Sequence, residues 1–103
     1  MNNDPAAALA VVDELLLGPD SILVRLRARE GLDPAQYATL VAAVQVLVEH
    51  YRGKAEVPKR LALAFVDISN FFYYSEEAYP TDVLERLEDA AHELTQLANE
   101  LFT

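Results

Sequence analysis

Aspartate followed by proline occurs twice in this chain, each time before a stretch with helical spacing of apolar residues. An aspartate side chain caps the free N–H groups of a helix, and proline fits the first helical position because its missing N–H is not needed there. Asp4-Pro5 therefore predicts a helix to about Leu17, which Gly18-Pro19 ends. Asp33-Pro34 predicts a longer helix that ends at Gly53.

The longer helix carries the clearest apolar stripe. Gln36 is placed to complete a capping box with Asp33. The β-branched residues between Leu40 and Val48 also suit a strand, but the length of the stretch and its cap favour a helix. The stripe repeats at three and four residues and comprises Tyr37, Leu40, Val41, Val44, Leu47, Val48 and Tyr51.

Three further helices are expected. Residues 20–30 predict a short helix closed by Gly31, with Ile22, Leu23 and Leu26 facing inward. Pro58 opens another helix, and Thr81 is placed to cap the last one, which reaches about Phe102. The inward seam before the break at Tyr79-Pro80 comprises Leu61, Phe65, Ile68 and Phe72. The seam of the last helix comprises Leu84, Leu87, Ala91, Leu94, Ala98 and Leu101.

No stretch alternates apolar and polar residues between turn signals, so no sheet is expected. Amphipathic helices with short connections predict an all-α fold, a compact antiparallel bundle of four to five helices. With 103 residues, we expect a single helical domain over 1–103.

The charge balance excludes several classes of protein. Seventeen Asp and Glu against eight Lys and Arg give a net charge of −9, which repels nucleic-acid phosphates and anionic lipid. The absence of Cys excludes disulfides and thiolate metal sites. An anionic start and the lack of a long apolar run predict a cytoplasmic protein with no membrane segment.

Catalytic signals are also missing. Two histidines without Cys do not supply the three or four ligands of a zinc site. His92 follows Asp89 by three residues and Glu88 by four, but a di-iron site uses Glu-x-x-His twice and no second such motif exists. The serines have no neighbouring His, and three glycines cannot build a phosphate-binding loop. We therefore expect no enzyme activity, no cofactor and no metal.

The surplus of acids lies almost entirely in the second part of the chain. Residues 1–60 hold eight acids and seven bases, a net charge of −1, whereas residues 61–103 hold nine acids and Arg86 alone, a net charge of −8. Five acids recur on one helical face, namely Asp82, Glu85, Asp89, Glu93 and Glu100. The arrangement suits either a solvated surface or a surface for a cationic partner. The basic residues are expected to pair within the chain, to be solvated, or to meet the acidic part of a second copy.

Aromatic residues concentrate between 65 and 79, and one helix cannot bury four consecutive rings at 71–74. These rings either wedge between helix ends or join the acids in a binding surface, where tyrosine is a common anchor. The predicted partner-binding surface comprises Asp67, Asn70, Phe71, Tyr74, Glu76, Glu77, Tyr79, Asp82, Glu85 and Asp89.

Two stretches carry a resemblance to a known group of proteins. One is the Ala-Leu-Ala-Val-Val-Asp run at 8–13. The other is Lys59-Arg60-Leu61 with Leu63, Ile68 and Phe72, followed by Leu84, Leu87, Asp89 and Ala90. In these positions the chain resembles the small all-α immunity proteins of bacterial secreted toxins, of type VI or contact-dependent systems. The resemblance implies a protein that occludes the active site of a cognate toxin and does no chemistry itself.

The expected partner is therefore a cognate protein toxin or another basic protein. The alternative is an acidic helical adaptor or secretion chaperone, which would often be a homodimer with an exposed apolar groove. A third option is a helical scaffold subunit of a larger assembly. Sensitivity to salt separates the first two, since an acidic plug weakens with ionic strength.

Overall fold

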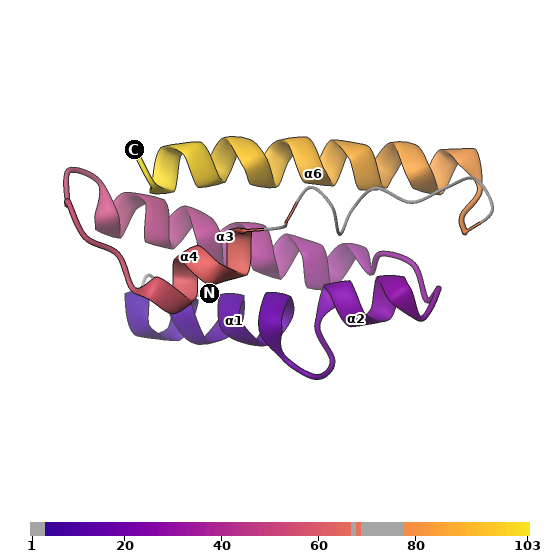
Figure 1. Ribbon diagram of the computed structural model, residues 1–103, viewed down its shortest axis with the longest axis horizontal. Helices are drawn as coiled ribbons and strands as arrows, with labels where there is room; N and C mark the ends of the chain where they lie inside the picture. Colours follow the sequence, from indigo (N-terminus) through magenta and orange to yellow (C-terminus); the bar gives the residue numbers. More distant parts are fainter. Residues whose placement is uncertain (1–3, 67, 69–77) are drawn as a thin grey trace.

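The computed structural model describes residues 4–66, 68 and 78–103, and these residues form helices with no strand among them (Figure 1). The all-α prediction is thereby confirmed. The helices are α1 (Pro5–Leu17), α2 (Ile22–Arg27), α3 (Pro34–Tyr51), α4 (Lys59–Phe65) and α6 (Thr81–Leu101).

Each of the first three helices begins at a polar residue whose side chain accepts a hydrogen bond from a free N–H group of the first turn. The Asp4 carboxylate accepts a hydrogen bond from the Ala6 N–H at 3.0 Å, and that of Asp33 accepts one from the Ala35 N–H at 2.9 Å. Ser21 caps α2 by accepting from the Val24 N–H at 3.2 Å. The two Asp-Pro starts are confirmed.

The last two helices begin differently. Pro58 and Pro80 occupy the N-cap positions of α4 and α6, and neither helix has a side-chain cap. The expectation that Thr81 caps the last helix is wrong, because Thr81 is already its first helical residue.

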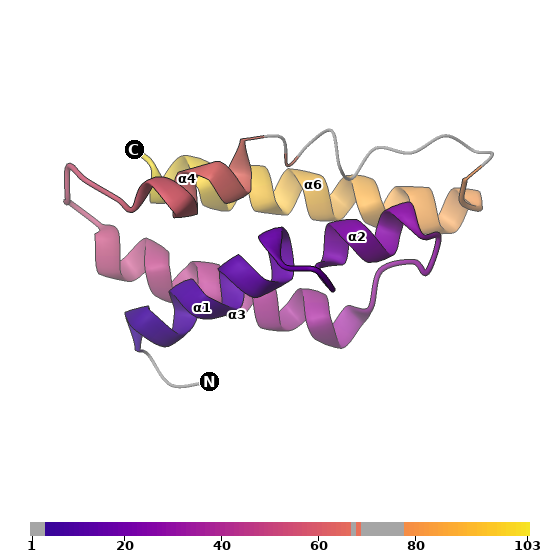
Figure 2. The same ribbon diagram turned by 60° about the horizontal axis from the view of Figure 1, so that its bottom comes forward.

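Helix α3 lies at the centre of the bundle. It packs against α1 on one side and α6 on the other, and α4 packs on α1. Figures 1 and 2 show that α3 returns antiparallel to α1, whereas α6 runs in the same direction as α3. The molecule is elongated along these helices, with extents of 42 × 23 × 20 Å.

The core consists of the seams expected from the sequence, with small additions. Leu61, Phe65 and Ile68 are buried as predicted, and Phe72 lies outside the described residues. In α3 the buried set includes Ala43, which the predicted stripe lacks, while Val41 is only partly buried. The fully buried leucines are Leu26, Leu40, Leu47, Leu87 and Leu94.

Helix α6 spans the bundle from one end to the other. Near its C-terminus the Phe102 ring meets the Phe65 ring of α4 edge to face, with centroids 5.7 Å apart. Before its N-terminus, Tyr79 bonds to Leu26 of α2 and to Gly31 in the loop that follows α2. Contacts at both ends therefore fix the position of the most acidic helix against the rest of the protein.

Candidate functional site

The outward side of α6 is strongly acidic. Here the acidic face means the six exposed carboxylates Asp82, Glu85, Glu88, Asp89, Glu93 and Glu100. Arg86 is the one Lys or Arg residue on this helix. The inward side holds Leu87, Leu94 and Leu101, all buried. This division follows from the 3.6-residue helical period and places the net negative charge in solvent.

Internal pairing neutralises little of the acidic face. Arg86 reaches Asp82 at 3.5 Å, and both side chains are mainly exposed. His92 lies 3.9 Å from Glu88. Within the described residues, Glu85, Asp89 and Glu100 form no ion pair. Exposed pairs of this kind contribute about 0–1 kcal/mol, so the field of the helix stays negative.

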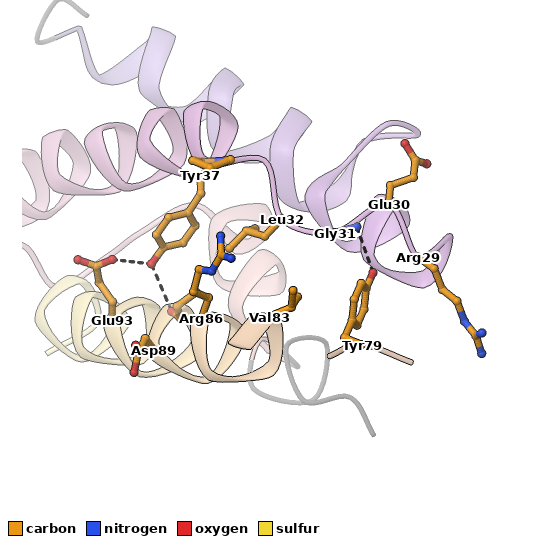
Figure 3. Close-up of a pocket in the computed structure, with 12 residues that line it drawn as sticks. Arg29, Glu30, Gly31, Leu32, Tyr37, Tyr79, Val83, Arg86, Asp89 and Glu93 are labelled. Atoms are coloured by element: carbon orange, nitrogen blue, oxygen red, sulfur yellow. Dashed lines mark hydrogen bonds between the residues drawn. The ribbon is translucent and has the colours of Figure 1, made fainter. Parts of the chain in front are cut away.

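A cavity of about 680 Å³ opens beside the acidic face, between α6 and the start of α3 (Figure 3). The loop from Arg29 to Leu32 forms one wall, with Pro34 and Tyr37 of α3 beside it. The other wall comes from α6 and comprises Val83, Arg86, Asp89, Ala90 and Glu93. This volume lies in the range of ligand-binding pockets, which combine apolar walls with a few polar groups.

The Tyr37 hydroxyl connects the two walls. It donates a short hydrogen bond of 2.5 Å to Glu93 Oε1 and lies 3.4 Å from the Ala90 carbonyl oxygen. Burial raises the pKa of Tyr37 well above its ordinary value of 10.0, and the hydrogen bond and negative charge of Glu93 raise this pKa further. Tyr37 is therefore a neutral donor that holds the Glu93 carboxylate at the rim of the pocket.

Tyr79 lines the end of the pocket that lies away from Glu93 (Figure 3). Its hydroxyl donates to the Leu26 carbonyl oxygen at 2.7 Å and accepts from the Gly31 N–H at 3.2 Å. The loop it holds has two residues with left-handed backbone, Arg29 at φ 61° and Gly31 at φ 82°. A non-glycine residue in this region costs about 1–2 kcal/mol, so the Tyr79 bonds help to maintain an otherwise unfavourable loop.

The residues predicted for partner binding are placed as follows. Asp82, Glu85 and Asp89 are exposed on α6, and Asp89 lines the pocket. Tyr79 is only 6% exposed, so the expectation of an exposed contact residue does not fit its position in the core. The remaining predicted residues, Asp67, Asn70, Phe71, Tyr74, Glu76 and Glu77, lie outside the described residues.

The prediction missed Tyr37 and did not include Glu93, although both lie at the centre of the pocket. Tyr37 looked like one more member of an apolar stripe. Its hydroxyl was the available signal, because a partly buried phenol needs a hydrogen-bond partner. The partner, 56 residues away, could not be identified from local spacing.

The described residues contain no group of three or more potential metal ligands. Among the helices of residues 4–66 and 78–103, none is long and apolar enough to cross a membrane. No protein-family model, curated protein or solved structure matches this chain. The site is therefore interpreted from its own geometry and charge.

Proposed function

We propose that this protein binds a positively charged partner protein through the acidic face of α6 and covers the partner's functional surface. The specific form of the proposal is an immunity protein that occludes the active site of a cognate bacterial toxin. That form rests on the resemblance in the stretches at 8–13, 59–72 and 84–90. Binding to a cationic surface rests on the distribution of charge.

The observation that carries the proposal is that α6 exposes six carboxylates against one arginine, and that Glu85, Asp89 and Glu100 form no ion pair within the described residues. Glu85, Asp89 and Glu93 follow one another at four-residue spacing and are all exposed. Like charges at this spacing destabilise a helix by about 0.2–0.5 kcal/mol per pair. Positive and negative surfaces that match accelerate association and select the partner, so a binding role accounts for the arrangement.

The first experiment isolates the partner and then measures binding with purified components. The tagged protein is used to recover proteins from its own host at low and at high salt. An identified partner is then purified, and its association rate with this chain is measured by stopped flow. Occlusion of a toxin further predicts that the purified chain inhibits the partner's activity at a one-to-one ratio.

The decisive experiment compares two double variants that each replace two acids with lysines, and so change the net charge of the protein by the same amount. Glu85→Lys with Asp89→Lys should slow association at least about tenfold, because both carboxylates lie on the acidic face. Asp20→Lys with Glu56→Lys changes the net charge equally at exposed positions away from α6 and is the control. Equal rates for the two double variants would contradict the proposal.

An acidic adaptor or secretion chaperone is the alternative, and exposed apolar residues favour it. Val24, Leu63 and Val66 are 40%, 56% and 68% exposed and line a shallow hollow of about 340 Å³. This alternative predicts a dimer in sedimentation equilibrium and partner binding that persists at 1 M salt. An immunity protein that acts by charge predicts binding that weakens steeply with salt.

A further inference from the structure

The pocket between α3 and α6 has a charge pattern that selects one kind of occupant. In Figure 3 the Arg29 and Glu30 side chains point away from Tyr37, so they contribute little to the interior. Arg86, Asp89 and Glu93 remain as the charged side chains along the α6 wall. Two carboxylates against one guanidinium make this wall net negative.

The charged groups of the α6 wall differ in how many of their hydrogen-bonding positions are already used within the protein. Arg86 already has Asp82 as a partner at 3.5 Å. Asp89 forms no ion pair within the described residues. Glu93 accepts from Tyr37 through Oε1, and a carboxylate can accept several further hydrogen bonds. The acceptors of the pocket are therefore available for a donor, and a cationic donor gains most from them.

The apolar part of the pocket suits a long side chain with a planar head. Leu32, Val83 and Ala90 give aliphatic surface to the lining of the pocket. The Tyr37 ring extends from α3 toward Glu93 of α6 (Figure 3). An arginine stem packs on aliphatic surface, and its guanidinium can make two parallel hydrogen bonds to a carboxylate and stack on aromatic rings. A volume of about 680 Å³ leaves room for neighbouring apolar residues.

We propose that this pocket receives an arginine of the partner protein, flanked by apolar residues, with its guanidinium held by Asp89 and Glu93. This inference rests on the proposed function and adds to it a defined anchor point. The acidic face then attracts the partner from a distance, and the pocket fixes its position. Arginine is among the residues that most often dominate the energy of protein interfaces.

The test uses three matched peptides and the complete ¹⁵N-labelled protein. The probe is acetyl-Leu-Arg-Leu-amide. Acetyl-Leu-citrulline-Leu-amide has the same shape without the charge, and acetyl-Leu-Glu-Leu-amide carries the opposite charge. The arginine peptide should shift the amide signals of Leu32, Tyr37, Val83 and Ala90. The citrulline peptide should bind at least about fivefold more weakly. Tighter binding of the glutamate peptide would overturn the proposal.

Protein variants separate the pocket from the general charge of α6. Asp89→Asn with Glu93→Gln should weaken the arginine peptide at least about fivefold, and Gln can still accept from Tyr37. Glu85→Gln with Glu88→Gln removes the same charge from the same helix outside the pocket. It should change binding less than about twofold, and equal losses in both double variants would overturn the pocket.

Two further variants keep the result independent of those substitutions. Arg86→Gln removes the competing cation and should strengthen the arginine peptide about twofold or more. Val83→Phe should narrow the pocket and reduce the shifts, with unchanged circular dichroism as the check on folding. If Arg86→Gln weakens the arginine peptide, the pocket proposal fails. If the peptide tests fail while Glu85→Lys with Asp89→Lys still slows the intact partner, the acidic face stands without the pocket.

Discussion

Helices α3 and α6 are similar in length, with 18 and 21 residues, and lie side by side, yet they differ strongly in the number of charged side chains that they carry. Helix α3 contains one carboxylate, Glu49, which pairs with Arg52 at 2.7 Å, and its exposed positions include Ala35, Ala38 and Thr39. Helix α6 exposes six carboxylates and one arginine. Both helices bury leucines completely.

The difference shows which features of the chain serve the fold. Helix α3 has a single carboxylate, so a long helix in this bundle does not need a row of exposed acids for its own packing. In α6, Glu93 is the acid that bonds across to α3, through the Tyr37 hydroxyl. Stability comes from the apolar seams and from a few buried hydrogen bonds. The acidic face is therefore available for recognition, which is the basis of the proposed function.

The largest effects should come from the shared property of the two helices, their buried leucines. Leu47→Ala in α3 and Leu87→Ala in α6 should each lower the free energy of unfolding by about 2–5 kcal/mol, because both side chains are 0% exposed. Urea denaturation followed by circular dichroism measures both. A cost below about 1 kcal/mol for Leu87→Ala alone would mean that α6 is only loosely attached.

The hydroxyl that anchors the start of α6 should come next. Tyr79→Phe leaves the Leu26 carbonyl without this donor and should cost about 1–3 kcal/mol in the free energy of unfolding. Tyr51→Phe, at the partly exposed end of α3, is the control and should stay within about 0.5 kcal/mol. Equal effects in thermal or urea melts would show that the Tyr79 hydroxyl does not anchor α6.

The two helix starts should respond differently to loss of a polar side chain. Asp33→Ala removes the cap of α3 and should cost about 0.5–2 kcal/mol. Thr81→Ala at the start of α6 should change stability by less than about 0.5 kcal/mol, since Thr81 does not cap this helix. A larger loss in Thr81→Ala than in Asp33→Ala, measured by urea denaturation, would reverse the comparison.

The bond between the two helices predicts a dependence on alkaline pH. Tyr37 has a raised pKa in the folded protein, whereas the unfolded chain releases this proton near the ordinary value of 10.0. Above about pH 10 the unfolded state therefore binds fewer protons, and stability falls as the pH rises. Tyr37→Phe should show a shallower decline between pH 9 and 11 in urea melts. Identical slopes would contradict the interpretation of the Tyr37–Glu93 bond.

The smallest effect concerns the charges themselves, and its sign should differ between the helices. Glu85→Gln with Asp89→Asn should stabilise the protein by a few tenths of a kcal/mol at low salt, because like-charge repulsion along α6 is removed. Glu49→Gln in α3 should destabilise it by about 0–1 kcal/mol through loss of the Arg52 pair. Thermal melts at low salt and in 1 M NaCl measure both, and the two differences should shrink in salt.

Local patterns in the sequence predicted the helices, but they did not predict the contacts between residues that are far apart in the chain. Asp4-Pro5 and Asp33-Pro34 located two helix starts because capping involves only the next three residues. The apolar seam of α6 followed from its period. Thr81 was misassigned because proline at the preceding position took the cap.

The pocket could not be predicted in the same way. It depends on the Tyr37–Glu93 bond, which joins residues 56 apart, and on a loop with left-handed Arg29. Neither a pairing across the bundle nor a strained backbone angle leaves a local pattern in one sequence. The spacing of three acids predicted that they share one outward face of α6, namely Asp82, Glu85 and Asp89. Tyr79 was expected on the surface, because its hydrogen bond to the Leu26 carbonyl joins two distant parts of the chain.

The Tyr79 hydrogen bond also has a consequence for the order of folding. It joins residues 53 apart, so forming it closes a long loop. Closing that loop costs conformational entropy, and the contacts between its two ends offset this cost only once they have formed. Helices α1, α2 and α3 are consecutive in the chain, and their mutual contacts close shorter loops. Contacts between near elements form earlier than distant ones, so we expect α6 to dock late. The pocket would then exist only in molecules that have completed this last step.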